Sequence, residues 1–149
     1  MKVKKIALCL CAVTLSTQIA AKDLAEEKEV ACWVRTELAL SVNSKVKESG
    51  ASYYDETQRM ALTLHGMRWG DAAKAKYLVK LKVAETTFAS AQDRVEETEN
   101  AALEKHLGTL DLSVGEAAIR KEVFKFRLNR MKLLGCLGNA NPVLYKVAN

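Results

Sequence analysis

The sequence predicts an all-α fold: an antiparallel bundle of about four helices, the third of them the longest, stapled by one disulfide. Three observations predict it. Apolar residues recur every three to four positions over long stretches, no stretch of comparable length alternates as a β-strand does, and the chain has a single proline and only 7 glycines among 149 residues. Almost half of the residues are apolar and the charges are nearly balanced, which excludes a disordered chain.

The first 21 residues have the three-part layout of a secretory signal peptide. Three lysines fall within the first five positions, an apolar run extends from Ile6 to Leu15, and small residues follow up to Ala21. The run is about ten residues long, half of the roughly 20 that span a bilayer. We therefore expect cleavage near Ala21 and no stable membrane insertion afterwards, so that residues 22–149 form a single helical domain.

Removing the leader changes the charge argument. Lys2, Lys4 and Lys5 leave with it, so the mature chain carries 20 basic against 18 acidic residues, where the whole chain carries 23 against 18. A surplus this small does not support binding to nucleic acid.

Two cysteines remain in the mature chain, Cys32 and Cys136, because Cys9 and Cys11 belong to the leader. A single pair in an exported protein predicts one disulfide, and we expect these two residues to form it. The short lysine-rich leader and the absence of any Asn-x-Ser/Thr acceptor favour the bacterial periplasm as the compartment.

Four helical ranges follow from the spacing of apolar residues and from the residues that cap helices. They run from Asp23 to about Ser49, from Asp55 to Gly70, from Asp71 to Gly108 and from Ser113 to Gly138. The second range carries the apolar stripe Met60, Leu64 and Met67 and is the shortest. Consecutive helices with short connections pack antiparallel, which places Cys32 and Cys136 at the same end of the bundle.

The fourth range carries two apolar arcs. The arc expected to face the core consists of Ile119, Val123, Phe126, Leu133 and Leu137. Phe124, Leu128 and Met131 lie some way round the helix and are suited to a homodimer or to another protein, with Arg120 and Arg127 beside them. Arg130 falls inside the main arc, so it either pairs with an acid of the third helix or marks a site that binds a carboxylate or a partner.

Two further features are candidates for partner binding. Trp33 and Leu40 share a face of the first helix away from its main stripe, and this face is covered by the second helix or by the C-terminal segment 143–147, or else it binds a partner. Tyr53 and Tyr54 lie in a Ser/Gly-rich connection of a composition suited to recognition, unless one of them packs back onto the second helix.

The sequence contains no motif of a catalytic, metal-binding or cofactor-binding site. His65 and His106 are the only histidines, and no zinc, haem or Gly-rich phosphate motif is present, so we expect neither a metal nor a cofactor. The serines lack the glycine frame of a hydrolase. Glu96, Glu97 and Glu99 are expected to form a solvated acidic helix face. We therefore expect no enzymatic activity.

A binding function remains. We expect an exported periplasmic protein that binds or inhibits a protein partner without catalysis. Two alternatives stay open: a periplasmic chaperone or envelope-stress factor that presents amphipathic helices to unfolded clients, and a minor structural subunit of an envelope secretion apparatus.

In its leader, its size, its helices and a late cysteine in the segment KLLGCLGNA (132–140), the chain loosely resembles small helical periplasmic immunity proteins. Those proteins neutralise peptidoglycan-cleaving effectors of rival bacteria. The resemblance implies that the partner is a cell-wall-targeting effector and that this chain blocks the effector's active-site groove sterically.

Overall fold

The computed structural model describes residues 19–47 and 56–138, and all regular structure in these two ranges is helical. The elements, in chain order, are α1 (Ala21–Glu26), α2 (Lys28–Lys47), α3 (Glu56–Ala73), its π-helical continuation η1 (Lys74–Lys80), α4 (Glu85–Leu107), the 3₁₀ turn η2 (Leu112–Val114) and α5 (Glu116–Leu133). None of the described helices is both long and apolar enough to cross a membrane. Most of the predicted leader lies outside the described residues, so its cleavage stays a prediction.

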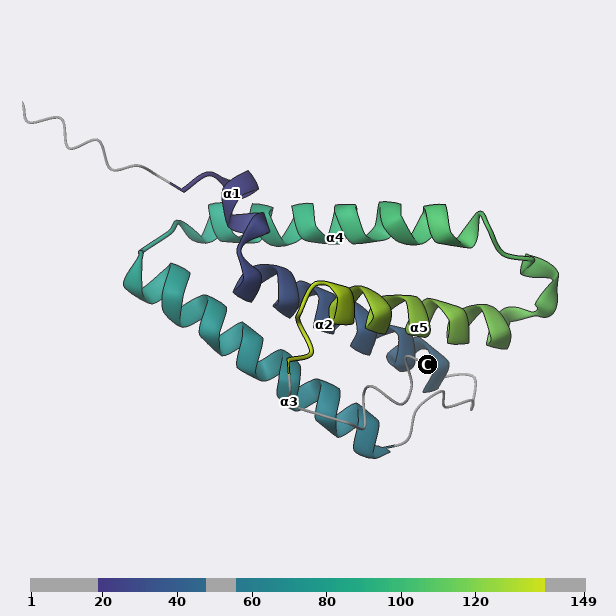
Figure 1. Cartoon of the computed structure of the whole chain (residues 1–149). Helices are drawn as coiled ribbons and strands as arrows, with labels where there is room; N and C mark the ends of the chain where they lie inside the picture. The colour runs from purple at the N-terminus through teal and green to yellow at the C-terminus, as the bar shows by residue number, and fades with distance from the viewer. Residues whose placement is uncertain (1–18, 48–55, 139–149) are drawn as a thin grey trace, which may run out of the picture.

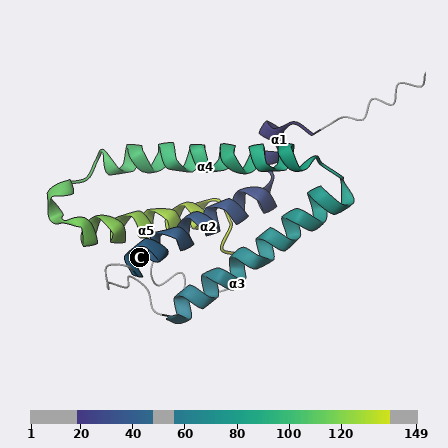
Figure 2. The ribbon, with the colours of Figure 1, turned by 180° about the vertical axis from the view of Figure 1, so that it is seen from behind.

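The four long helices alternate in direction, as Figure 1 shows, and the predicted all-α bundle is confirmed. α2 is the central helix: α3 packs on one side of it, and α4 and α5 pack on the other (Figure 1; Figure 2). α1 lies across the start of α4. The longest α-helix is α4, which is the third of the four long helices, as predicted.

The predicted boundary between the second and third helices is wrong. The sequence places it at Gly70, but the helix continues through Gly70 and Ala73 into η1, and the chain turns only after Lys80. The turn passes through Lys82, which has a left-handed φ of 49°. No glycine or proline marks this turn, so the sequence carries no local signal for it.

Two of the predicted N-terminal caps are also absent. Asp23 lies inside the first turn of α1, whose N-cap is Ala20. Ser113 lies in η2, where its backbone N–H donates to Asp111 Oδ1 over 2.9 Å, and Gly115 precedes α5 with a φ of 93°.

Glycines in α3 allow it to lie close against α2. Gly66 and Gly70 are one turn apart and both are buried. A methyl group built on Gly66 would lie 3.2 Å from Thr36 Cγ2, and one built on Gly70 would lie 3.0 Å from two atoms of the Trp33 indole. These glycines are therefore the surface on which α2 packs, rather than the breaks that their helix propensity predicts.

Gly70→Ala is expected to destabilise the protein by about 1–3 kcal/mol, because the added methyl group overpacks the contact with Trp33. Trp33 has little room to yield, since its ring also lies 6.0 Å from that of Phe88. Alanine is the better helix former by about 1 kcal/mol, which works against this loss. Urea unfolding measures the difference. Gly108→Ala is the matched control, because a methyl group there meets nothing closer than 3.5 Å; equal stability changes in the two variants would contradict the close packing.

The largest core cluster surrounds the disulfide. Cys32 and Cys136 are bonded, with Cα atoms 5.1 Å apart, as the sequence predicts. Both are buried, at 1% and 0% exposure. The other buried members of the cluster are Ala39, Leu62, Phe124, Leu128, Met131 and Leu137. The disulfide therefore joins the start of α2 to the segment after α5 within an apolar cluster.

α5 turns a different face to the core than its spacing predicts. Phe124, Leu128 and Met131 are at most 1% exposed and belong to the disulfide cluster. Of the predicted core arc, Leu133 is 80% exposed, and only Leu137, which lies after α5, is fully buried. The prediction of the buried face is wrong because two arcs of similar apolarity compete. The buried arc is the one that packs around the disulfide.

Candidate functional site

Three of the side chains predicted to contact a partner lie on α5. Phe124 and Arg127 are 1% and 5% exposed, which places them inside the bundle. Arg130 is partly exposed and forms an ion pair with Glu99 of α4, which is the first of the two roles that the sequence left open for it. In this fold Phe124 and Arg127 offer little surface to a protein partner.

The other predicted contact residues do not extend this group into a surface. Trp33 is half-buried against Gly70, and Lys74 Nζ lies 4.9 Å from the centre of its ring. Leu40 is half-buried and packs on the disulfide cluster. The face that these two residues share is therefore covered by α3. Tyr53 and Tyr54 lie outside the described residues, so their contact with a partner stays a prediction.

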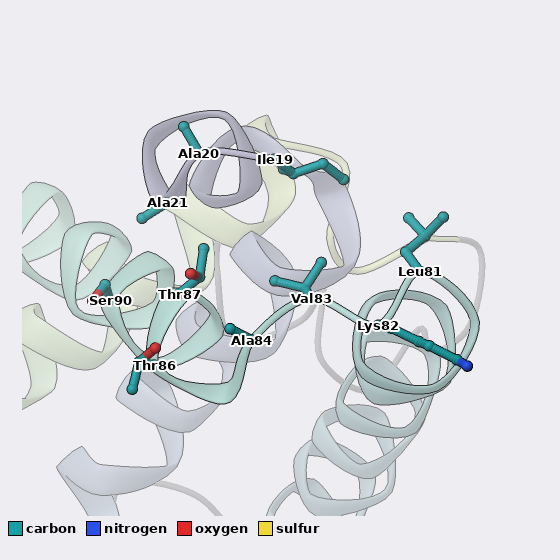
Figure 3. A pocket seen from close by; sticks show the side chains of 10 residues that line it. All are labelled: Ile19, Ala20, Ala21, Leu81, Lys82, Val83, Ala84, Thr86, Thr87 and Ser90. Carbon is teal, nitrogen blue, oxygen red and sulfur yellow. The ribbon is translucent and has the colours of Figure 1, made fainter. Parts of the chain in front are cut away.

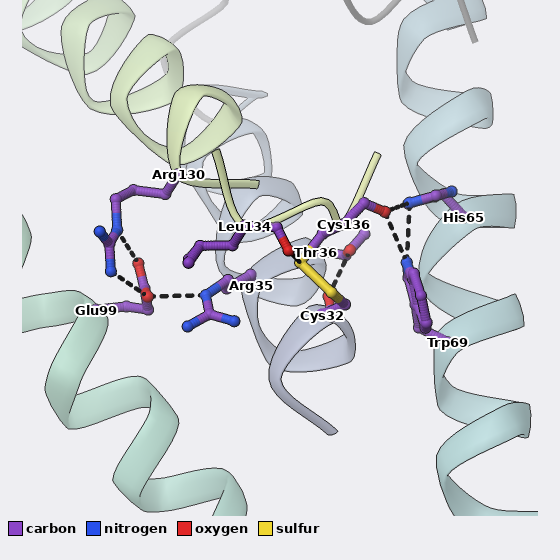
Figure 4. The surroundings of a disulfide bond; sticks show 9 residues. All are labelled: Cys32, Arg35, Thr36, His65, Trp69, Glu99, Arg130, Leu134 and Cys136. Atoms are coloured by element: carbon purple, nitrogen blue, oxygen red, sulfur yellow. Dashed lines mark hydrogen bonds and ion pairs between the residues drawn. A yellow bond between two sulfur atoms is a disulfide. The ribbon is translucent and has the colours of Figure 1, made fainter. Parts of the chain in front are cut away.

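Glu99 is buried, and the prediction that it is solvated is wrong. It was expected on a solvated acidic face, but it is 1% exposed and occupies the seam of α4 one position after Thr98. Arg130 donates to both of its carboxylate oxygens over 2.9 Å, and Arg35 Nε donates to Oε1 over 2.8 Å (Figure 4). The carboxylate therefore links α2, α4 and α5.

The charge of Glu99 is stabilised by these partners. Burial opposes ionisation, but the guanidinium groups of Arg130 and Arg35 outweigh it and hold the pKa of Glu99 below its ordinary value of 4.5. Arg127 adds a bond from Nη1 to the backbone carbonyl of Glu99 over 3.0 Å. The whole arrangement is an interior ion network that fixes three helices.

A second polar cluster lies beside the disulfide. The carbonyl oxygen of Cys136 accepts a hydrogen bond from Trp69 Nε1 over 3.0 Å and lies 2.5 Å from His65 Nε2, as Figure 4 shows. Trp69 Nε1 also donates to His65 Nε2 over 2.9 Å, so the two side chains and the carbonyl form one hydrogen-bonded cluster. His65 and Trp69 thus attach the segment after α5 to α3, which is a structural role.

A third cluster fixes the break between α1 and α2. Tyr77 of η1 donates to Glu27 over 2.5 Å and to Glu29 over 3.1 Å, and Lys76 also binds both carboxylates. Burial and the hydrogen bonds to these acids raise the pKa of Tyr77, so the phenol remains a donor at neutral pH. The π-helical geometry of η1 places Tyr77 and Lys76 side by side against the break.

A cavity of about 810 Å³ lies between α1 and the start of α4. Figure 3 shows that small and hydroxyl side chains line it; its lining residues are Ile19, Ala20, Ala21, Leu81, Lys82, Val83, Ala84, Thr86, Thr87 and Ser90. Lys82 is the one charged residue among them, and a single amine supplies no acid and base pair. Predicted cleavage after Ala21 would remove Ile19, Ala20 and Ala21 from the wall, so we do not place the functional site here.

The described residues also provide no metal-binding cluster. Within residues 19–47 and 56–138, no group of three or more His, Cys, Asp and Glu side chains is placed to hold a metal ion. His106 instead stacks on Phe126, with ring centres 4.8 Å apart.

The candidate site is the outer face of α3, which we define as Met60, Leu64 and Met67. These residues are 57%, 52% and 58% exposed and follow the i, i+4, i+7 spacing of one helix face. The spacing marks this stripe as the packing side of the helix, but the glycine side packs on α2 in its place. The sequence shows the stripe without showing that it faces outwards.

No protein-family model matches the chain, and neither a curated protein nor a solved structure is detectably similar to it. A proposal about its function therefore rests on the sequence and the structure of this chain alone.

Proposed function

We propose that this chain is an exported, non-enzymatic periplasmic protein that binds a protein partner through the outer face of α3. The observation that carries the proposal is the row Met60, Leu64 and Met67, which the fold leaves exposed although every other long helix buries its main apolar stripe at least in part. Soluble proteins rarely leave a contiguous apolar surface without a use.

The chemistry of this face fits a partner with an apolar groove. Anchors at i, i+4 and i+7 are the pattern by which a helix binds in such a groove. Three half-exposed side chains supply on the order of 300 Å² of apolar surface, less than the about 800 Å² that each side of a standard interface buries. A groove that also contacts the flanks of α3, such as Thr63 and Arg68, makes up the difference, whereas a flat contact between two copies of α3 does not.

A rigid frame behind the face favours inhibition of a partner. The disulfide and the buried carboxylate of Glu99 tie α2, α4 and α5 together, and His65 and Trp69 attach α3 to the segment after α5. α3 is therefore presented without a large ordering cost on binding. We propose that the partner is an enzyme with a groove-shaped active site, which α3 occludes. A cell-wall-targeting effector, the partner class of the immunity proteins that the chain resembles, has the required location.

A chaperone is the second candidate. Two of the three side chains on the outer face of α3 are methionines, Met60 and Met67, and flexible thioethers suit surfaces that adapt to many clients. A chaperone would suppress the aggregation of unrelated unfolded proteins at comparable concentrations, while an inhibitor would bind one partner stoichiometrically. Aggregation assays with two unrelated clients separate the two candidates.

Leu64→Asp is expected to abolish partner binding and to leave the melting temperature unchanged within about 2 °C, because the side chain is 52% exposed. Pull-down of the exported protein from native periplasm, followed by melting of the purified variant, measures both quantities. Val114→Asp is the matched control, an equally drastic change at a residue 59% exposed in the connection before α5. Retained binding in Leu64→Asp, or equal loss in both variants, would overturn the assignment of the outer face of α3.

A further inference from the structure

A cavity of about 410 Å³ lies between α2, α4 and α5, away from the outer face of α3. Two arginines of α5, Arg120 and Arg127, form part of its wall. Its other lining residues are Leu38, Ser41, Val42, Glu96, Asn100, Leu103 and Val123. Four of these nine residues are apolar (Leu38, Val42, Leu103 and Val123), and the charged groups are two guanidinium groups against one carboxylate.

Both arginines carry a buried N–H donor that has no partner among the described residues: Nη1 of Arg120 and Nε of Arg127. Other nitrogens of the two guanidinium groups are hydrogen-bonded. Arg127 Nη1 and Nη2 bond to the Glu99 carbonyl over 3.0 Å and to Asn100 Oδ1 over 2.7 Å, and Arg120 Nη2 bonds to Glu116. Buried donors on charged groups are costly to leave unpaired, so this wall lacks an acceptor.

The charge of Arg127 is the second observation. The residue is 5% exposed, and burial lowers its pKa although the carboxylates of Glu99 and Glu96 act in the opposite direction. Glu99 is already shared with Arg130 and Arg35, so it does not neutralise Arg127 alone. An anion bound at Arg127 would offset this cost.

The cavity continues along α2. A neighbouring cavity of about 620 Å³ shares Leu38, Ser41 and Glu96 with it and reaches Trp33. Val34 and Leu38 lie in this stretch. Apolar side chains on the α2 side therefore lead from the two arginines of α5 towards the indole of Trp33, with Glu37, Gln92 and Glu96 also in the wall.

We propose that this groove binds an anionic amphiphile, a carboxylate on an aliphatic chain. The carboxylate accepts hydrogen bonds from Arg120 and Arg127, in the geometry for which guanidinium groups are suited. The aliphatic chain lies along Val34 and Leu38 towards Trp33, so that the apolar side chains of the groove contact the chain and the arginines fix its carboxylate end. The site is separate from the outer face of α3 and does not depend on the proposed partner.

Decanoate, used below its micellar concentration, tests the proposal. Titration is expected to change the fluorescence of the protein in a saturable way, and Trp33→Phe is expected to remove the change, since Trp33 lines the groove and Trp69 lines neither of its two cavities. Decanol and acetate, which lack the charge and the chain respectively, are expected to bind at least tenfold more weakly. Decanol binding as tightly as decanoate would overturn the proposal.

Arg120→Gln supplies the matching variant, because Arg120 is at the edge of the bundle with a side chain 27% exposed. We expect decanoate affinity to fall at least tenfold, while Lys121→Gln, which removes an exposed charge from the neighbouring position, leaves it unchanged. Arg127 is too deeply buried for a clean substitution, so the Nε–H resonance of Arg127 is followed by NMR in the unaltered protein. A shift of that resonance on titration is expected; an unmoved resonance, or unchanged affinity in Arg120→Gln, would contradict the site.

Discussion

Glu99→Gln is expected to lower the free energy of unfolding by about 3 kcal/mol at pH 7, since removing one partner of a buried ion pair leaves the others uncompensated. Glutamine keeps the shape of the side chain but removes the charge that Arg130 and Arg35 face from two other helices. We place the loss at the lower end of the range for buried pairs because the side chains of Arg35 and Arg130 are 15% and 29% exposed and regain water. Denaturant unfolding measures it.

Two controls accompany this prediction. Glu97→Gln removes an exposed charge from the same helix and is expected to change stability by less than about 0.5 kcal/mol. Because the folded pKa of Glu99 lies below its ordinary value of 4.5, its stabilisation is present above that value and disappears as the pH falls through the folded pKa. The difference between the wild-type protein and Glu99→Gln should therefore shrink between pH 5 and strongly acidic conditions. A difference that is constant with pH would contradict the role of this charge.

The double variant Cys32→Ser, Cys136→Ser is expected to lose about 2–5 kcal/mol of stability. The disulfide spans 104 positions of the chain, so its removal gives the unfolded ensemble a large gain in conformational freedom. The buried serine hydroxyls add to the loss, since both positions lie in the largest core cluster. Thermal melting should show a decrease of roughly 10 °C or more.

Reduction of the wild-type protein gives an independent readout. The carbonyl of Cys136 is bonded to Trp69, so release of the segment after α5 is expected to change tryptophan fluorescence. Intact mass after alkylation should increase by two thiol adducts only when the exported protein has been reduced. Two adducts without reduction, or a double variant that melts with the wild type, would contradict a stabilising disulfide.

Much of the architecture follows from local pattern and compartment. The periodicity predicts helices, and an exported chain with two cysteines predicts the bond between Cys32 and Cys136, which is confirmed. The face that each helix buries does not follow from local pattern alone. On α5 the two arcs differ little in apolarity, and the choice depends on contacts with Cys32 and Cys136, which are far away in sequence.

The α3 helix shows why the candidate site was missed. Helix propensity treats Gly66 and Gly70 as weak points, but a glycine also permits close approach of a neighbour, and here that neighbour is Trp33. Once the glycine side packs, Met60 and Leu64 must face outwards. A glycine pair one turn apart opposite an apolar stripe is the signal that could have indicated this arrangement.

The buried carboxylate could have been anticipated in part. Arg130 falls inside an apolar arc, and this position requires an acidic partner on a neighbouring helix. Glu96, Glu97 and Glu99 are all acids of the third predicted helix, and only the register between α4 and α5 selects Glu99. Register between helices is set by the whole interface, which a single sequence does not reveal.

Photo-crosslinking from position 64 tests the proposed function most directly. A photoreactive residue replaces Leu64 in the exported protein, and Val114 in a matched control, and both proteins are irradiated in intact cells challenged with the partner's source. We predict one adduct of defined mass from position 64 and none from position 114, with excess wild-type protein suppressing it and excess Leu64→Asp failing to do so. A self-adduct alone, equal adducts from both positions, or a broad range of adducts would contradict a dedicated partner at the outer face of α3.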